Sequence, residues 1–285
     1  MNSLIHHYAK RMEPLKHVPV IDAHGHLGHC SIVHAALGDA REIVKSMDSI
    51  GIIATAISAF QSLGGNVVRG NDAVAAAIQA FPGRFIGYGT VNPLFPYEVL
   101  REVNRCLDEL GMWAIKIHPT MHANTAPDAP VYQDVYANLD ERRGVVLSHT
   151  FGSPEILDVL SSRYPRVTFI FAHAGSNFEP ELAHRLVPLM NERENVYIDT
   201  CLSVVRYGNL EKWVTLAGPD RLLFGSDVPF NDNAHQIGRV THTRLPEADK
   251  VKILGQNVID LLKRTGGWTT NLDKLVDLGG TANVE

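Results

Sequence analysis

The chain has 285 residues, 45% of them hydrophobic, and a formal net charge of −5 at pH 7. That length is ordinary for an α/β barrel, which typically needs about 250 residues. The acidic balance and the lack of a basic run argue against nucleic acid as a partner. No apolar run is long enough to span a membrane.

The cysteines and the N-terminal stretch point to a compartment. Cys30, Cys106 and Cys201 lie far apart and form no Cys-x-x-Cys pair, which is typical of a protein kept reduced. The stretch around Lys10 and Arg11 lacks the apolar region of a signal peptide. We therefore expect a cytoplasmic protein.

Short apolar runs alternate with helix-like segments along most of the chain. The sequence predicts eight strands, at 18–21, 52–58, 85–91, 113–117, 145–148, 167–172, 196–200 and 222–225. It predicts helices at 3–13, 39–49, 71–81, 97–110, 131–142, 154–164, 180–191, 210–217 and 247–264. Proline, glycine and capping residues mark several of their ends, such as Asp39 before the second helix.

Eight strand–helix units with near-continuous apolar strands predict a parallel sheet covered on both sides. We expect a distorted (β/α)8 TIM barrel with a short N-terminal helix and a C-terminal tail, 266–285. An open, doubly wound sheet is the alternative, but no Gly-x-Gly-x-x-Gly or phosphate loop follows a strand. We expect a single domain, 1–285, with its core at about 18–264.

The first predicted strand leads into Asp22-Ala-His-Gly-His26. Alternate side chains of a strand share one face, so His24 and His26 project together. Two imidazoles on one face can bind a single transition-metal ion. Taken alone, a His-x-His pair is more often two polar residues at a strand end, so further ligands are needed to support a metal site.

Further polar residues come at the ends of later strands. They are Lys116 and His118 after strand four, His149 after strand five, His173 after strand six and Asp227 after strand eight. Each has a simpler reading: a buried core histidine, a salt-bridging lysine, an aspartate that caps a turn. In a barrel, however, the carboxyl ends of all strands meet at one mouth, where active sites are built. Together they favour a shared metal site.

These residues lie within motifs of a known family. The motifs are Asp-Ala-His-Gly-His at 22–26, Ile-Lys-Ile-His-Pro at 115–119, Leu-Ser-His-Thr at 147–150, Phe-Ala-His-Ala-Gly at 171–175 and Phe-Gly-Ser-Asp-Val-Pro at 224–229. The set resembles the amidohydrolase superfamily of metal-dependent barrels, and within it the amidohydrolase-2 group. Asn257 matches the group's closing segment, although Val258 replaces the usual alanine.

The resemblance implies that His24, His26, His149 and Asp227 bind one divalent ion, for which we expect Zn²⁺, with Mn²⁺ or a second metal as alternatives. Three imidazoles and a carboxylate suit zinc, which lowers the pKa of a bound water to about 7. Asp227 would carry the proton of the reaction. His173 would stand beside the water or the substrate.

A two-metal site is the alternative arrangement. In binuclear members of the superfamily a carbamylated lysine bridges two ions, and Lys116 with His149 and His173 would then bind the second one. We favour one metal. The residues expected to contact substrate are His118, Lys116, Arg69 and Arg206. Arg239 is a third loop arginine that could bind a carboxylate.

The resemblance supports two reactions. The first is hydrolysis of an ester, lactone or amide of a small polar substrate by metal-activated water. The alternative is non-oxidative decarboxylation of an aromatic or unsaturated acid at the same metal site. A barrel that binds a ligand without turnover is a third reading, disfavoured because His173 accompanies the complete ligand set. Family habit also predicts a homodimer.

Overall fold

A computed structural model describes residues 4–29, 38–173, 180–201 and 207–277 of the chain, without the side chains of 180–184. The eight predicted strands are present, and they form one parallel sheet in chain order. The strands are β1 Val20–Leu27, β2 Ile52–Ala59, β3 Phe85–Thr90, β4 Ala114–Ile117, β5 Val145–Ser148, β6 Thr168–Phe171, β7 Val196–Asp199 and β8 Leu222–Leu223.

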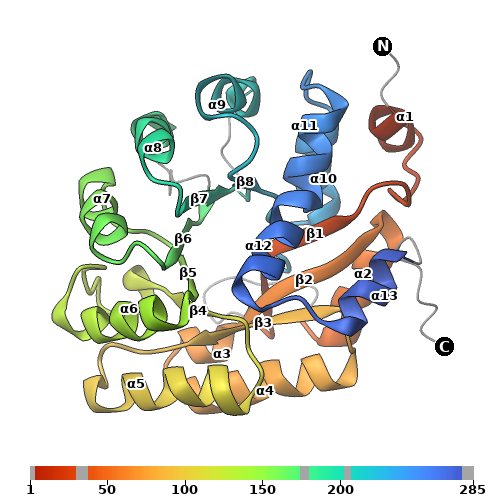
Figure 1. Cartoon of the computed structure of the whole chain (residues 1–285). Coiled ribbons are helices and arrows are strands. Elements are labelled where there is room, and N and C mark those ends of the chain that lie inside the picture. Colours follow the sequence, from red (N-terminus) through yellow and green to blue (C-terminus); the bar gives the residue numbers. More distant parts are fainter. Residues whose placement is uncertain (1–3, 30–37, 174–179, 202–206, 278–285) are drawn as a thin grey trace.

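The sheet curls until β8 meets β1 (Figure 1). Three backbone hydrogen bonds join the two segments: Ala23 N to Phe224 O (2.8 Å), Asp227 N to His24 O (2.7 Å) and His26 N to Val228 O (2.6 Å). No longer ladder joins β1 and β8 in the described residues, so the barrel is nearly closed rather than regular. The distorted (β/α)8 barrel is therefore confirmed.

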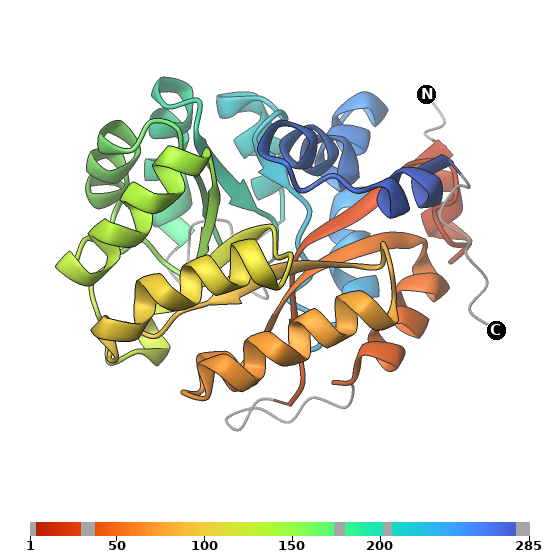
Figure 2. The same ribbon diagram turned by 60° about the horizontal axis from the view of Figure 1, so that its bottom comes forward.

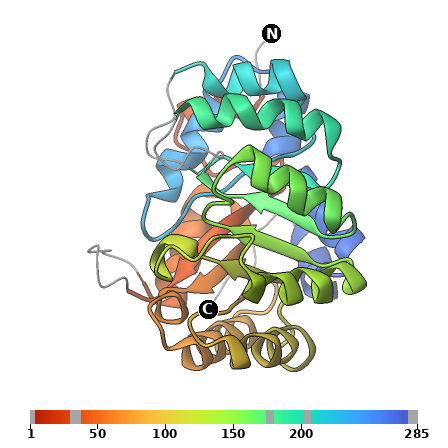
Figure 3. The same ribbon diagram turned by 90° about the vertical axis from the view of Figure 1, so that its left-hand side faces the viewer.

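Helices surround the sheet, and Figure 3 shows α6 to α8 as an outer layer in front of the strands. The helices are α1 Leu4–Lys10, α2 Ala40–Ile50, α3 Phe60–Leu63, α4 Val67–Ala80, α5 Pro96–Asn104, α6 Pro130–Arg142, α7 Pro154–Arg163, α8 Pro180–Glu192, α9 Asn209–Ala217, α10 Asn233–Thr241, α11 Glu247–Val251, α12 Asn257–Thr265 and α13 Thr270–Asp277. Asp39 caps α2 as predicted, since its side chain accepts the backbone N–H of Glu42.

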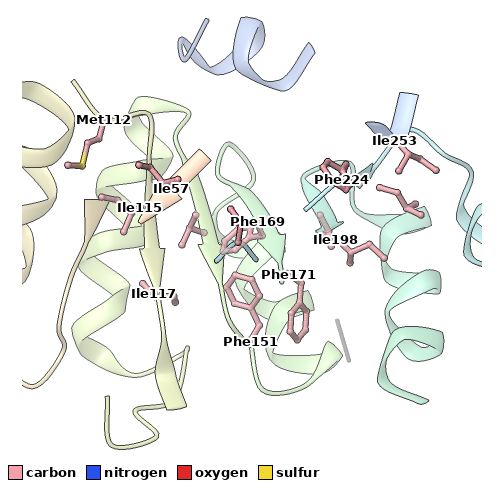
Figure 4. Packing of buried hydrophobic residues seen from close by; sticks show 14 of the residues in the cluster. Ile57, Met112, Ile115, Ile117, Phe151, Phe169, Phe171, Ile198, Phe224 and Ile253 are labelled. Atoms are coloured by element: carbon pink, nitrogen blue, oxygen red, sulfur yellow. The ribbon is translucent and has the colours of Figure 1, made fainter. Parts of the chain in front are cut away.

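Apolar side chains of the strands alternate between two packed layers. On β6, Phe169 and Phe171 point outward into the layer that the helices cover, while Ile170 and Ala172 pack in the cluster inside the sheet. Figure 4 shows the outer layer around the two phenylalanines. The inner positions at the carboxyl ends of the strands are where polar side chains replace apolar ones.

Part of the predicted C-terminal tail, 266–285, is helical. α13 was not predicted, yet its Leu272 and Leu275 are buried against the inner cluster of the sheet. Leu275 packs beside Gly83, which precedes β3, so α13 covers the amino ends of the strands (Figure 2). Residues 278–285 of the tail lie outside the described residues. That 1–285 form a single domain stays a prediction.

A second unpredicted helix, α10, follows the loop after β8. Its cap is Asp232, whose carboxylate accepts the N–H groups of Ala234 and His235. The N-terminal helix α1 packs against α10, and the N–H groups of Leu4 and Ile5 donate to Glu247 at the start of α11. Within the described part of the chain, no helix combines the length and the apolar character needed to cross a membrane.

Gly25 provides a test of the seam between β1 and β8, by which we mean residues 23–26 and 224–228 where their backbones are hydrogen-bonded. A Cβ atom at this position would lie 2.7 Å from Cγ2 of Thr55 and 3.1 Å from Cγ1 of Val228. We expect Gly25→Ala to lower the free energy of unfolding by about 1–3 kcal/mol, the usual cost of overpacking. Urea unfolding measures it. Gly238→Ala, within α10 and with no atom near the new methyl group, should instead stabilise by roughly 0.5–1 kcal/mol. Equal effects of the two substitutions would contradict this account.

Candidate metal centre

Three side chains meet where β8 joins β1. His24 and His26 lie within β1, which extends to Leu27, and Asp227 follows β8. Oδ1 of Asp227 lies 3.1 Å from Nε2 of His26 and 3.6 Å from Nε2 of His24. All three are buried, and their ligand atoms lie within 4.8 Å of one another, a spacing that suits one metal ion. The structure thus brings together three of the residues that the sequence singled out, and their binding of a metal ion stays a prediction.

The ring of His24 is held by an acid on a neighbouring strand. Nδ1 of His24 lies 2.8 Å from Oδ2 of Asp199, which is fully buried at the end of β7. A carboxylate only accepts hydrogen bonds, so Nδ1 carries the proton and Nε2 presents a lone pair to the centre. Nζ of Lys116 lies 2.8 Å from that Nε2. The hydrogen bond from Nδ1 of His24 to Asp199 is the usual way in which an outer carboxylate orients a histidine that binds a metal.

His26 is fixed from two sides. Its Nδ1 lies 3.0 Å from Oγ of Ser58 on β2. Its ring stacks on Phe60, the first residue of α3, with centroids 4.4 Å apart and the planes 18° from parallel. Nε2 of His26 faces Oδ1 of Asp227, and in the tautomer that carries its proton on Nδ1 this Nε2 can serve as a second ligand.

A chain of hydrogen bonds sets the tautomers of His173 and His149. Nδ1 of His173 lies 3.2 Å from the carbonyl oxygen of Cys201, so this nitrogen donates. In the neutral ring Nε2 of His173 then accepts from Nδ1 of His149, 2.9 Å away. That leaves Nε2 of His149 with a lone pair, as a metal ligand requires. His149 lies outside the group of three, so its ligation stays a prediction.

His118 supports His149 by stacking. The two rings are 4.0 Å apart and 14° from parallel. Nδ1 of His118 accepts from Oγ1 of Thr120 (3.0 Å) and from the backbone N–H of Met121 (3.4 Å). A neutral His118 therefore carries its proton on Nε2 and can donate it to a bound molecule.

The backbone at the mouth is strained at two of these positions. His173 and Asp227 adopt left-handed φ angles of 60° and 63°, a conformation that costs energy for residues other than glycine and that occurs often at functional sites.

The carboxylate of Asp22, fully buried, accepts the N–H groups of His24 and Ser226 and the hydroxyl of Ser226. Asp22 thus ties the segment that carries His24 to the segment that precedes Asp227.

Burial dominates the electrostatics of the centre. It lowers the pKa of His24 to about 4 and that of Lys116 to about 8, since both side chains are removed from water. Burial alone would raise the pKa of Asp227, but the hydrogen bond from His26 and the field of His24 outweigh it and lower the pKa. The centre therefore presents neutral imidazoles and an ionised carboxylate, the protonation state in which they bind metal.

This donor set fits a divalent ion. His24 and His26 each present Nε2 beside the Asp227 carboxylate, and the opposite nitrogen of each ring is held by Asp199 or Ser58. Catalytic zinc sites use this combination of nitrogen and oxygen ligands, with outer partners on the histidines.

The predicted substrate-binding residues are less well gathered. Lys116 and His118 lie at the centre, as described. Arg69 is exposed on α4, and Arg206 lies outside the described residues. Nη1 of Arg239, on α10, donates to the carbonyl oxygen of Thr200 (3.2 Å), just beyond β7. The roles of these residues in binding substrate stay predictions.

Two central residues, Asp199 and Cys201, were not singled out from the sequence. Cys201 is fully buried with its Sγ 3.1 Å from Nδ1 of His24. Asp199 ends an apolar strand, as the predicted residues do, and this position was the available signal. Ser58 likewise ends the predicted strand 52–58, whereas nothing comparable marked Phe60.

We predict that Asp199→Asn weakens metal binding about 10–100-fold, because an amide cannot hold the Nδ1–H of His24 as a carboxylate does. Titration of metal-free protein with Zn²⁺ or Mn²⁺ measures the affinity. Asp108→Asn, which removes only an exposed ion pair with Arg142, is the matched control. Unchanged affinity in Asp199→Asn would exclude Asp199 as a partner of the ligand.

The buried histidines also predict how stability depends on pH. Burial lowers the pKa of His24, His26, His118, His122 and His149. Below about pH 6.5 the unfolded chain binds protons at these imidazoles and the folded protein does not. The free energy of unfolding therefore decreases as the pH is lowered, by at most roughly 1.4 kcal/mol per pH unit for each histidine. Asp22, whose pKa burial raises to about 7, offsets one of the five.

Urea midpoints of metal-free protein at pH 7 and pH 5 test this, and we expect the lower midpoint at pH 5. His118→Asn should reduce the difference, whereas His7→Asn, at an exposed position of α1, should leave it unchanged. An equal or higher midpoint at pH 5 would show that these imidazoles bind protons in the folded protein.

Comparisons with known proteins agree with the geometry. A family model described as amidohydrolase matches residues 21–264. A 2-amino-3-carboxymuconate-6-semialdehyde decarboxylase from Dictyostelium discoideum is 23% identical over an alignment of 234 residues that covers 67% of this chain and 65% of that protein. A gamma-resorcylate decarboxylase from Polaromonas sp. strain JS666 is 23% identical over 248 residues, 68% of this chain and 75% of that protein. The chain thus spans just under two thirds of the first relative.

One solved structure shows the same fold. It is a dihydroxybenzoic acid decarboxylase from Polaromonas sp. JS666 with bound manganese and the inhibitor 2-nitroresorcinol. The two chains superpose with a TM-score of 0.72 at 19% identity, over 90% of this chain and 99% of the other. The overall fold is therefore shared.

Proposed function

Because the chain belongs to the amidohydrolase family, we propose that it is a metal-dependent decarboxylase of a small aromatic or unsaturated carboxylic acid. The observation that carries the proposal is the buried group of His24, His26 and Asp227, with the Nζ of Lys116 beside it, in a chain whose relatives are named decarboxylases. Hydrolysis was the first expectation from the sequence. The relatives favour the alternative, decarboxylation.

The proposed ligands of the ion are His24, His26, His149 and Asp227. Three nitrogens and one carboxylate oxygen suit Zn²⁺, and they also suit Mn²⁺, the metal bound in the Polaromonas structure. When bound, the ion supplies positive charge that draws electrons from the reacting carboxylic acid as its carbon–carbon bond breaks. Either ion is therefore proposed, rather than zinc alone.

One ion is favoured over two by the position of Lys116. Its Nζ lies 2.8 Å from Nε2 of His24, and its side chain is fully buried. A positive charge there would attract a substrate carboxylate. The two-metal alternative would need this amine to be carbamylated and His173 to leave its bond with His149. We therefore propose a cationic, unmodified Lys116 as a contact of the substrate.

Asp227 is proposed to carry the proton of the reaction. When CO₂ leaves, the electron pair of the broken bond stays on the substrate carbon, and one proton must reach that carbon. Asp227 is the carboxyl group that lies beside the Nε2 atoms of both His24 and His26, so it can take a proton from the bound acid and return it to carbon. His173, through its hydrogen bond with His149, is proposed to hold that ligand in place.

The contacts with the substrate are proposed from the hydrogen-bond donors at the centre. Nε2–H of His118 and Nζ of Lys116 can hold a carboxylate or a phenolic oxygen, while Arg69 and Arg206 remain proposed contacts from the loops. The substrate is a small molecule, as the inhibitor 2-nitroresorcinol is in the Polaromonas structure. A homodimer and a cytoplasmic location stay predictions.

The proposal predicts metal-dependent release of CO₂ from at least one member of a panel of hydroxybenzoates and unsaturated dicarboxylic acids. Asp227→Asn should lower the rate by at least about 100-fold, the smallest effect usual for loss of a general acid or base. Released bicarbonate and the decarboxylated product are quantified together. Asp158→Asn, which removes an exposed ion pair with Arg193, should keep the full rate.

The same protein is assayed with a matched panel of esters, lactones and amides. Hydrolysis that depends on Asp227 and on metal, without decarboxylation, would replace the proposal by the hydrolase reading. Decarboxylation that survives Asp227→Asn unchanged would refute the role of Asp227.

A further inference from the structure

A second group of possible ligands lies behind the first, on the other nitrogen of the same histidine. Nδ1 of His24, a carboxylate oxygen of Asp199 and Sγ of Cys201 lie within 4.8 Å of one another. Asp199 and Cys201 are fully buried, and His24 is only 1% exposed. The first group contains nitrogen and oxygen donors, whereas this one adds a sulfur.

The spacing of these atoms resembles that around a tetrahedral ion. Sγ of Cys201 lies 3.1 Å from Nδ1 of His24, 3.0 Å from Oδ1 of Asp199 and 3.5 Å from Nδ1 of His173. In a tetrahedral zinc site, bonds of about 2.3 Å to sulfur and 2.0 Å to nitrogen place those two atoms about 3.5 Å apart. Small side-chain shifts of a few tenths of an ångström would therefore admit an ion.

A divalent cation that binds the thiol of Cys201 also removes its proton, because a coordinating thiol is deprotonated outright. Binding would release the thiol proton and the Nδ1 proton of His24, and the ion's two positive charges balance the protons lost.

We propose that Nδ1 of His24, Asp199 and Cys201 form a second, thiophilic metal site that a soft ion such as Cd²⁺ or excess Zn²⁺ fills. The site shares His24 with the first centre, one ring nitrogen for each ion. Filling it removes the bond by which Asp199 orients His24, so the second ion acts as an inhibitor. Ions that prefer oxygen, such as Mg²⁺ and Mn²⁺, would not select the sulfur.

This site is independent of the reaction proposed above, because it depends only on where the donors lie. Metal-free protein is titrated with Cd²⁺, and bound ions are counted by equilibrium dialysis while the near-ultraviolet absorbance of the thiolate–cadmium bond is recorded. We expect two bound ions per chain and a thiolate band that grows with one of them. Cys201→Ser should remove the band and leave one ion bound.

Because Cys201 is a direct ligand, Cys201→Ser should lower the affinity for the second ion by more than about 100-fold. That is the upper end of the loss of affinity that follows the loss of an outer partner. Cys106→Ser is the matched control, because Cys106 is also buried but its sulfur faces Glu102 at 3.7 Å rather than a histidine. The band should persist in Cys106→Ser and in Cys30→Ser. Asp227→Asn should weaken the first ion and keep the band.

Several outcomes would overturn the proposal. Wild-type protein that binds one ion without a thiolate band would do so, as would a band that survives Cys201→Ser. A band without any ion dependent on Asp227 would instead leave this site standing and refute the first centre. Circular dichroism of Cys201→Ser and Cys201→Ala shows whether each variant is folded, so that a lost band can be assigned to the lost ligand.

Discussion

The structure depends most on the seam between β1 and β8. Backbone hydrogen bonds from Ala23, His26 and Asp227 close the sheet, and the same short segments carry the proposed metal ligands. A barrel that failed to close here would also separate Asp227 from both histidines. Because Gly25 and Gly225 have no side chain, the backbones approach closely enough, and a Cβ at Gly225 would meet those of His24 and Asp199 at 3.1 and 3.2 Å.

Around this seam, the proposed ligands are held by partners on other strands. Asp199 on β7 fixes His24, Ser58 on β2 fixes His26, and Asp22 binds the Ser226 backbone. Cooperation of this kind lets a barrel fold set both the direction and the protonation state of a ring before any ion arrives. The second donor group at Cys201 arises from the same arrangement, since the nitrogen that Asp199 orients is also accessible to a nearby sulfur.

Much of this fold could be predicted because its signals are local. Each apolar strand is short and bounded by glycine, proline or a cap, and the parity of His24 and His26 follows from the strand alone. The helices α10 and α13 were missed, because α10 depends on the Asp232 cap after an irregular loop and α13 on burial of Leu272 and Leu275 against distant strands. The role of Asp199 needs a contact across 175 positions of the chain, which a local pattern cannot show.

The central claim is that one divalent ion is bound by the residues at the seam. Elemental analysis of protein purified without chelator tests it most directly, with zinc, manganese and iron all counted per chain. The account predicts about one ion, lost in a protein that carries His26→Ala and Asp227→Asn together while the fold is retained. No bound ion in the wild type, even after reconstitution with zinc and manganese, would contradict it.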